Sequence, residues 1–252
     1  MKNNIIIVDL DRTLLHTDKS VSDYTIQTLK KCKNNDMKIL VATGRPLRNT
    51  TYYHNLINFD SLVLSNGARI ITKNKEILNS IDKESAKNII SILNEHNLTI
   101  TIETLDKAYS NKMINNYEST ISNDLNDVIE KNEILKIIIG IENKNTIDLV
   151  RKYMTENIYY TIAHEKVIQI MSKNASKFNG ISIVLEENNL NIENTIFFGD
   201  DNDDIESIKN CNIGVSMSNA IDKVKEASDY TTLSNDEDGV AIYINENILN
   251  EE

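Results

Sequence analysis

Two aspartates, Asp9 and Asp11, follow directly after four β-branched apolar residues at positions 5–8. Such a run predicts a buried strand, and open α/β sheets place their chemistry where strands end. Because side chains alternate along an extended chain, both carboxylates are expected on one side, within one small volume. Close carboxylates need a cation between them, unless one keeps its proton at neutral pH. The pair therefore suits phosphoryl transfer, with one Asp as nucleophile and the other as proton donor, although a strand end with a solvated turn is the alternative.

A second polar segment, Ala-Thr-Gly-Arg at 42–45, ends the apolar run at 39–41. Pro46 follows, a residue suited to the first turn of a helix. The Thr43 hydroxyl and the N–H groups at a helix start both favour an anion, so this segment predicts a phosphate cradle. An ordinary helix N-cap is the alternative interpretation.

Two further segments lie in the last third of the chain. Lys177 comes just before a helical apolar pattern over 181–185, and a solvated surface lysine is the alternative. Residues 199–204 read Gly-Asp-Asp-Asn-Asp-Asp after the apolar run 196–198. This acidic loop after a buried strand predicts a Mg²⁺ site, because a small hard cation takes one or two carboxylates and adds water and phosphate oxygens. A calcium loop competes, but the spacing lacks the Gly and Glu of an EF-hand.

The elements that must position these residues follow from the apolar pattern. Continuous apolar runs such as 62–64 and 196–198 are typical of a parallel sheet covered by helices on both faces. Strict alternation at 98–102 instead predicts a half-exposed strand of an antiparallel sheet. Further strand candidates lie at 134–141, 158–162 and 167–171. Two apolar stripes at helical spacing consist of Ala86, Ile89, Ile90 and Leu93, and of Ile147, Val150 and Met154. The middle of the chain therefore predicts an inserted sheet with helices on one face.

Four segments resemble, in order, the motifs of the haloacid dehalogenase superfamily: DLDRTLL, ATGR, the lysine of NASKFNGI, and GDDNDD. Two others are similar to segments of its Cof-type sugar-phosphate phosphatases: LSNGARI and the tail VSMSNAIDKVKEASDYTTLSNDEDGVAIYI. The resemblance covers nearly the whole core. It implies an α/β fold with a haloacid dehalogenase-like Rossmannoid core, in which helices sandwich a parallel sheet, at 1–80 and 173–252. It also implies an inserted α/β cap with a largely antiparallel sheet at 81–172.

The resemblance also assigns roles to residues. Asp9 would attack phosphorus, and Asp11 would protonate the leaving alcohol and then activate water. Mg²⁺, the implied cofactor, would be held by Asp9, the backbone carbonyl of Asp11, and Asp200. Asp204 would orient Lys177 or a metal-bound water. The residues that would contact the substrate or its phosphate are Leu10, Thr43, Gly44, Arg45, Lys177 and Asp203.

Two positions depart from the family. Arg12 stands where Gly is usual, and Asp203 stands where an Asn usually contacts phosphate. The two changes add opposite charges, so the net charge of the site stays the same. We therefore hypothesise a compensating pair across the catalytic cleft, in which Arg12 offsets the repulsion between Asp203 and phosphate. Unrelated changes, with Arg12 pointing to solvent, are the alternative.

The composition limits the partners. The 252 residues carry a net charge of −11, which opposes binding to nucleic acid or an anionic bilayer. No apolar run is long enough for a membrane span or a signal peptide, so cytoplasm is the expected location. No obligate protein partner is evident. A small phosphate ester is the expected partner.

The sequence predicts a Mg²⁺-dependent phosphatase that hydrolyses small phosphate monoesters through an aspartyl phosphate. Sugar phosphates or nucleotide-like cofactors are the expected substrates. Two alternatives stay open. A phosphomutase of the phosphomannomutase type would return the phosphoryl group to the sugar, and a non-catalytic member would only bind Mg²⁺ and phosphate.

Overall fold

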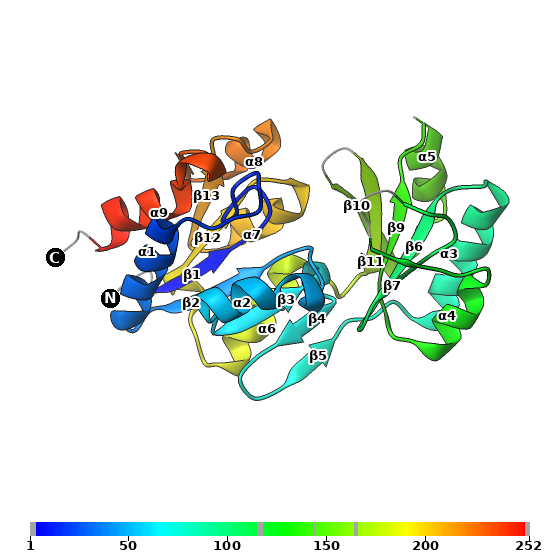
Figure 1. Cartoon of the computed structure of the whole chain (residues 1–252), viewed down its shortest axis with the longest axis horizontal. Helices are drawn as coiled ribbons and strands as arrows, with labels where there is room; N and C mark the ends of the chain where they lie inside the picture. The colour runs from blue at the N-terminus through cyan, green and yellow to red at the C-terminus, as the bar shows by residue number, and fades with distance from the viewer. Residues whose placement is uncertain (1–3, 115–117, 144, 164–165, 250–252) are drawn as a thin grey trace. The chain divides into compact units, whose positions relative to one another are not determined.

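The chain folds into two compact units, seen in the computed structural model of Figure 1. Residues 4–114, 118–143, 145–163 and 166–249 are described. The first unit combines Met1–Ile77 with Ser176–Glu252, and the second is Leu78–Ala175. Since the chain leaves the first unit and later returns to it, the second unit is an insertion.

The first unit is built on an eight-stranded sheet with the order β14-β13-β12-β1-β2-β3-β4-β5. The strands from β14 to β3 run parallel, and β4 is antiparallel to β3. The strand bounds are β1 (Ile5–Val8), β2 (Lys38–Ala42), β3 (Ser61–Leu64), β4 (Arg69–Ile71), β5 (Glu76–Leu78), β12 (Thr195–Gly199), β13 (Ile213–Met217) and β14 (Tyr230–Thr232). Every residue of β1 and β12 is buried, as the continuous apolar runs predict.

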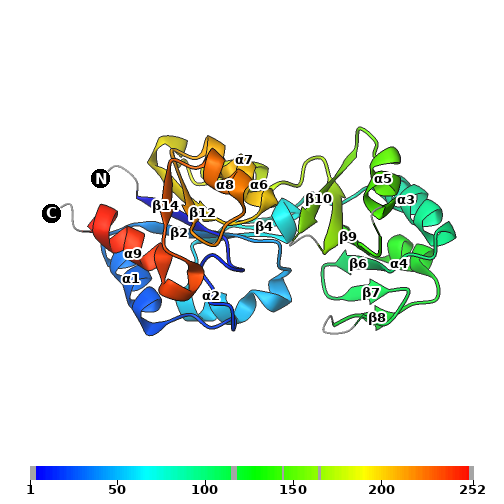
Figure 2. The same ribbon diagram turned by 90° about the horizontal axis from the view of Figure 1, so that it is seen from above.

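Helices cover both faces of this sheet. Figure 2 shows α1, α2 and α9 on one side and α6, α7 and α8 on the other. Their bounds are α1 (Asp23–Asn34), α2 (Thr51–Ile57), α6 (Lys177–Glu187), α7 (Ile205–Asn210), α8 (Asp222–Ala227) and α9 (Gly239–Ile244). Ser176 caps α6 by accepting the N–H of Asn179 at 3.0 Å, so the helix begins at Lys177. This cap fixes where Lys177 enters the site.

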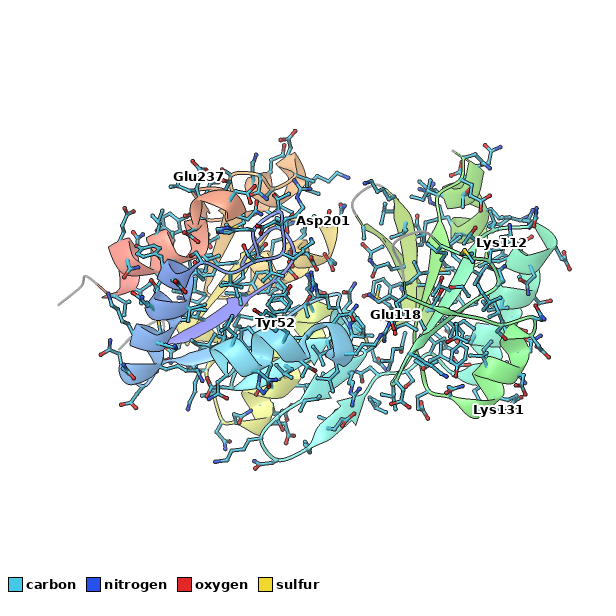
Figure 3. The ribbon with its side chains drawn as sticks, in the orientation of Figure 1. Tyr52, Lys112, Glu118, Lys131, Asp201 and Glu237 are labelled. Atoms are coloured by element: carbon cyan, nitrogen blue, oxygen red, sulfur yellow. The ribbon has the colours of Figure 1, made fainter. Side chains whose placement is uncertain are left out.

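The second unit has a six-stranded sheet with the order β10-β11-β9-β6-β7-β8, antiparallel except between β7 and β8. Its strands are β6 (Ile100–Thr104), β7 (Ala108–Ser110), β8 (Thr120–Ile121), β9 (Ile134–Gly140), β10 (Ile158–Ala163) and β11 (Val167–Ser172). Its helices are α3 (Lys83–Glu95), α4 (Leu125–Lys131) and α5 (Asn145–Lys152). Alternate strand residues such as Ile100 and Ile102 pack with α3, α4 and α5 in one core, so the helices lie on one face of the sheet. Lys131 lies outside this core and pairs with Asp127 (Figure 3).

The predicted fold class is confirmed, with three local differences. β6 is buried along its whole length, whereas alternation at 98–102 predicted half exposure. The polar side chains of β6 find partners, since Thr101 Oγ1 lies 2.7 Å from Ser110 Oγ. α5 ends at Lys152, so Met154 packs beside the core from outside the helix. Pro46 caps a short 3₁₀ turn, Leu47–Asn49, before α2 begins. Within the described residues, no helix has the length and apolar character of a membrane span.

Candidate active site

Three adjacent parallel strands, β2, β1 and β12, end at the same edge of the first sheet. Asp9 follows β1, Thr43 follows β2, and Asp200 follows β12. Asp9 is held at this edge because its N–H donates to the Phe198 carbonyl at 3.0 Å. The sheet therefore collects polar groups from distant parts of the sequence into one place, as open α/β sheets do.

Lys177 is buried at the start of α6, with 3% of its surface exposed. Its Nζ donates to Asp9 Oδ1 at 2.9 Å and to Asp204 Oδ1 at 2.7 Å, and it lies 3.2 Å from Asp203 Oδ2. Burial alone would lower the pKa of Lys177, but Asp203, Asp204 and Asp9 outweigh burial and hold the pKa well above its usual value. The lysine is therefore charged at the centre of the site, and the solvated alternative is wrong.

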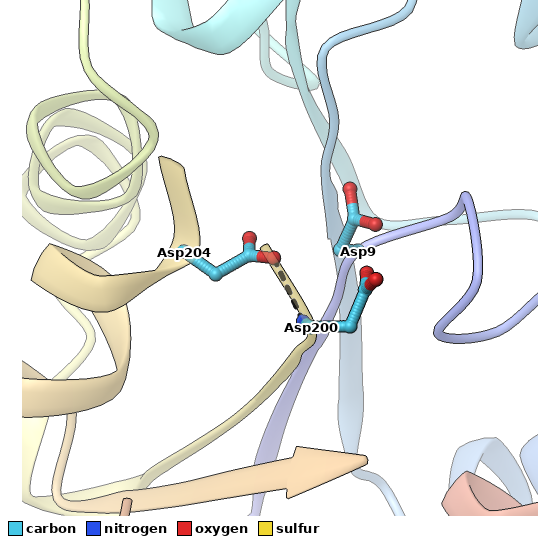
Figure 4. Close-up of side chains that lie close together, drawn as sticks. All are labelled: Asp9, Asp200 and Asp204. Atoms are coloured by element: carbon cyan, nitrogen blue, oxygen red, sulfur yellow. Dashed lines mark hydrogen bonds between the residues drawn. The ribbon is translucent and has the colours of Figure 1, made fainter. Parts of the chain in front are cut away.

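Asp9, Asp200 and Asp204 form a buried acidic cluster (Figure 4). Each offers a carboxylate oxygen, and these three oxygens lie within 4.8 Å of one another. Burial, followed by the neighbouring carboxylates, raises the pKa of Asp200 to about 8 and that of Asp204 to about 6. Burial also raises the pKa of Asp9 despite Lys177. The cluster therefore holds more negative charge than one lysine balances, which fits a divalent cation with oxygen ligands.

The loop after β12 is shaped around the Asp204 side chain. Asp204 Oδ2 accepts the N–H groups of Asp200 at 2.9 Å and Asp201 at 3.1 Å. A Cβ at Gly199 would lie 2.5 Å from the Asp204 Cγ, so the approach requires glycine there. Asp201, labelled in Figure 3, caps the short 3₁₀ turn Asn202–Asp204. Because Asp204 serves both the loop backbone and Lys177, it fixes Lys177 relative to Asp200.

Thr13, to which the sequence motifs assigned no role, also reaches this cluster. Its Oγ1 donates to Asp200 Oδ1 at 3.0 Å, and the side chain is buried. The signal was present in the sequence, since Thr13 is the last residue of the Asp-x-Asp-x-Thr string that begins at Asp9. The hydrogen bond orients Asp200 toward Asp9.

Asp11 lies in different surroundings from Asp9. Arg45 donates through Nε to Asp11 Oδ2 and through Nη2 to Oδ1, both at 2.6 Å, and Lys19 Nζ donates to Oδ1 at 2.7 Å. Burial would raise the pKa of Asp11, but Arg45 and Lys19 outweigh burial and hold the pKa well below its usual range. The Asp11 carboxylate therefore lies with Arg45 and Lys19, whereas the Asp9 carboxylate lies with Lys177, so the two side chains do not share one small volume as the alternation predicted. Side chains alternate only in an extended chain, and here β1 ends at Val8 and a turn begins at Leu10.

The Thr43 loop is held by the segment that follows β3. Thr43 is buried, and its Oγ1 accepts the Arg45 N–H at 3.2 Å. The N–H of Ser65 donates to the Arg45 carbonyl and that of Asn66 donates to the Thr43 carbonyl, both at 3.0 Å. Arg45, which is predicted to contact phosphate, binds the Asp11 carboxylate in this structure. The fully buried Leu10 has only backbone atoms to offer a substrate.

Arg12 and Asp203 do not form the hypothesised pair. Among the described residues Asp203 pairs with Lys177, and Arg12 has an exposed side chain and a left-handed backbone at φ 61°. The Arg12 carbonyl accepts Asn219 Nδ2 at 2.9 Å. Lys177, instead of Arg12, offsets the charge of Asp203.

The chain matches known proteins along nearly its whole length. A family model described as haloacid dehalogenase-like hydrolase matches residues 6–244. A curated relative, the 5-amino-6-(5-phospho-D-ribitylamino)uracil phosphatase YitU of Bacillus subtilis, is 26% identical over 97% of each chain. A solved haloacid dehalogenase-like hydrolase from B. subtilis superimposes with a TM-score of 0.88 at 21% identity, over 97% of this chain and 99% of the other. A solved structure of a Thermotoga maritima protein superimposes with a TM-score of 0.84 at 25% identity, over 98% of this chain and 97% of the other.

Proposed function

Because the chain belongs to the haloacid dehalogenase-like hydrolase family, we propose that it is a Mg²⁺-dependent phosphatase of small phosphate monoesters. The observation that carries the proposal is the buried Asp9 at the end of β1, which contacts Lys177 inside an acidic cluster. This arrangement joins a carboxylate nucleophile to a fixed cation, and it leaves uncompensated negative charge for a metal ion.

Asp9 is the nucleophile in this proposal. Its carboxylate attacks phosphorus and forms an aspartyl phosphate while the leaving oxygen takes a proton from Asp11. Lys177, Thr43 and the Gly44 amide bind the transferring oxygens. Mg²⁺, when held by Asp9, Asp200 and the Asp11 carbonyl, would neutralise charge on the phosphoryl group. Asp204 and Thr13 support this set, since they hold Lys177 and Asp200 in place.

The substrate class extends the proposal. The named substrate of the B. subtilis relative is a phosphate ester on a ribityl chain joined to a pyrimidine, which falls within the predicted class of sugar phosphates and nucleotide-like cofactors. We infer that the second unit is the cap that selects the leaving group. A non-catalytic member that only binds Mg²⁺ and phosphate would be credible if the Arg12 side chain filled the site, and the exposed side chain of Arg12 speaks against this.

Phosphate release by the purified full chain tests the proposal. The panel contains 4-nitrophenyl phosphate, ribose 5-phosphate and 5-amino-6-(5-phospho-D-ribitylamino)uracil, each with Mg²⁺, with excess chelator, and with Ca²⁺. We expect phosphate release with Mg²⁺, no release with excess chelator, and poor release with Ca²⁺. The larger coordination shell of Ca²⁺ misplaces the nucleophile. Full activity in chelator would refute the metal role. Conversion of a sugar phosphate to its isomer without release of phosphate would identify a mutase instead.

A further inference from the structure

The turn after β1 carries an arginine whose charge has no partner. Arg12 lies between Asp11 and Thr13, and its side chain is exposed. Within the part of the chain that the structure describes, its guanidinium takes part in no hydrogen bond or ion pair, and only its backbone carbonyl is engaged. The neighbouring cations Arg45 and Lys19 are both bound to Asp11. Arg12 therefore presents an uncompensated positive charge next to the site.

The backbone at Arg12 is one that glycine adopts without cost. Its φ of 61° lies in the left-handed region, which disfavours a side chain. The turn is closed by the Leu10 carbonyl, which accepts the N–H groups of Thr13 at 3.3 Å and Leu15 at 2.9 Å. Asn219 Nδ2 then donates to the Arg12 carbonyl at 2.9 Å. None of these contacts uses the Arg12 side chain, so the turn itself does not require an arginine.

The arginine therefore has its use outside the fold. A strained backbone that its surroundings enforce at a site is a sign of function. A guanidinium group is always charged, and it matches two oxygens of one carboxylate or phosphate. In the proposed mechanism Lys177 and Thr43 already serve the transferring phosphoryl oxygens. The anion that suits Arg12 is therefore a different group, and in a small phosphate ester that group lies on the leaving side.

We propose that Arg12 binds a second anionic group, a carboxylate or a second phosphate, on the leaving group of the substrate. This inference rests on the proposed phosphatase function and narrows its substrate class. Arg12 is then a specificity-determining residue, because it strengthens the binding of esters that carry the second anion. No bond is made or broken at Arg12, so the phosphoryl transfer itself is the same for both kinds of ester.

Three esters that share one carbon chain measure this contact. Glucitol 6-phosphate has a neutral leaving group, 6-phosphogluconate carries a carboxylate at the far end of the chain, and glucitol 1,6-bisphosphate carries a second phosphate there. The selectivity is the ratio of kcat/KM for each anionic ester to kcat/KM for glucitol 6-phosphate. We expect Arg12→Gln to lower this ratio about threefold to tenfold for at least one anionic ester, which lies between the effect of an exposed ion pair and that of a charged hydrogen bond. The ester affected identifies the anion as a carboxylate or a phosphate.

Two further variants and salt sharpen the test. Lys30→Gln is the matched control, since Lys30 is exposed on α1 and likewise has no hydrogen bond or ion pair among the described residues. Its selectivity should equal that of wild type. Arg12→Lys keeps the charge but loses the two-oxygen geometry, so its ratio should lie between those of Arg12→Gln and wild type. Adding about 0.3 M NaCl should lower the ratio more in wild type than in Arg12→Gln, because salt screens an exposed ion pair.

Arg12→Gly separates the role of the side chain from that of the turn. Glycine suits the left-handed backbone, so the melting temperature should not fall, while the ratio should fall as in Arg12→Gln. A lower melting temperature with unchanged ratios would mean that Arg12 is merely structural. An equal fall in Lys30→Gln would mean that only the net charge matters, and either result overturns the inference. Release of phosphate by wild type from 4-nitrophenyl phosphate but from neither anionic ester overturns the inference alone, whereas release from none of the four esters overturns the proposed function as well.

Discussion

Lys177 places one positive charge among carboxylates that outnumber it. It contacts Asp9, Asp203 and Asp204 while almost fully buried, and Asp200 belongs to the same acidic cluster. Buried charges are stable only when they are paired, and a single ammonium group cannot neutralise four carboxylates. Burial first, with the neighbouring carboxylates adding to it, raises the pKa values of Asp9, Asp200 and Asp204. The site is therefore electrostatically incomplete without a further cation.

Asp9→Asn tests the nucleophile. We expect phosphate release to fall by at least about a thousandfold, because the amide cannot form the acyl phosphate. Folding should be retained, since the volume is unchanged and Lys177 keeps Asp203 and Asp204. Asp36→Asn is the control, because Asp36 is exposed and its left-handed backbone, at φ 57°, also accepts Asn. A rate for Asp9→Asn within tenfold of wild type would remove the mechanism.

Thr13→Val tests the support of Asp200. Valine has nearly the same shape but removes the donor to Asp200 Oδ1. The Mg²⁺ concentration for half-maximal phosphate release should rise about tenfold, as is typical when a residue orienting a metal ligand is lost. Thr13→Ser keeps a hydroxyl and should stay within about twofold of wild type. Equal Mg²⁺ requirements in wild type and Thr13→Val would show that the hydrogen bond does not prepare the metal site.

The sequence alone could indicate which residues meet at the strand ends, but not all of their contacts. Asp9 and Asp200 follow adjacent strands, so the topology of an α/β sheet brings them together. Asp11 was misplaced because alternation assumes an extended backbone, and the chain turns at once. The contact of Lys19 depends on a left-handed turn that nothing in the composition of the loop announces.

At the scale of elements, three consecutive left-handed residues lie between the Thr43 loop and the start of α6. Ser65, Asn66 and Gly67 have φ values of 49°, 57° and 86°. The first two donate their N–H groups to the Thr43 loop, and Gly67 lies against the backbone of Ser176, the cap of α6. Such backbone strain persists only where the surroundings enforce it. We interpret this turn as the segment that sets the distance between Thr43 and Lys177.

Gly67→Ala should therefore be strongly destabilising. Its Cβ would lie 2.2 Å from the Ser176 carbonyl oxygen, and alanine disfavours the left-handed backbone. We expect a loss of about 3 kcal/mol or more in the free energy of unfolding, measured by urea denaturation. Gly140→Ala is the matched control, because the nearest atom to its Cβ is 3.9 Å away and its backbone is ordinary. Equal stability of the two variants would show that the turn can shift without cost.

The apolar patterns predicted which segments form strands and helices better than they predicted how buried those segments are. Continuous apolar runs such as 196–198 form buried parallel strands, because helices cover both faces of the sheet. Alternation at 98–102 predicted a strand correctly but predicted exposure wrongly, since alternation reports side-chain polarity and does not report what covers the polar face. Thr101 illustrates this, because it is buried and satisfied by Ser110 on the next strand.

At the scale of the whole molecule, the excess of acidic residues has its largest effect on stability in the first unit. A net charge of −11 is spread over the sequence, but the charge that alters stability is the buried cluster of Asp9, Asp200 and Asp204. An Asp whose pKa is raised by folding binds a proton more readily in the folded state. Between pH values of about 4 and 8 the folded protein therefore holds more protons than the unfolded chain, and its stability falls as pH rises.

The melting temperature of the metal-free protein should accordingly be lower at pH 8 than at pH 5.5. The pKa values of about 8 for Asp200 and about 6 for Asp204 set this window, whereas the lowered pKa of Asp11 acts below it and the raised pKa of Lys177 acts above it. We expect a decrease of at least about 3 °C, measured by differential scanning fluorimetry in excess chelator. Saturating Mg²⁺ should raise the melting temperature more at pH 8 than at pH 5.5, because the ion binds ionised carboxylates.

Asp200→Asn separates this linkage from a general effect of pH. Because the amide does not titrate, the melting temperature of the variant should decrease much less between pH 5.5 and pH 8. Mg²⁺ should also stabilise the variant less than wild type at pH 8. Asp36→Asn, which removes an exposed charge, should keep the wild-type dependence. A metal-free melting temperature that rises from pH 5.5 to pH 8 would mean that the cluster is ionised and balanced without a metal ion, and the electrostatic case for Mg²⁺ at this site would then fail.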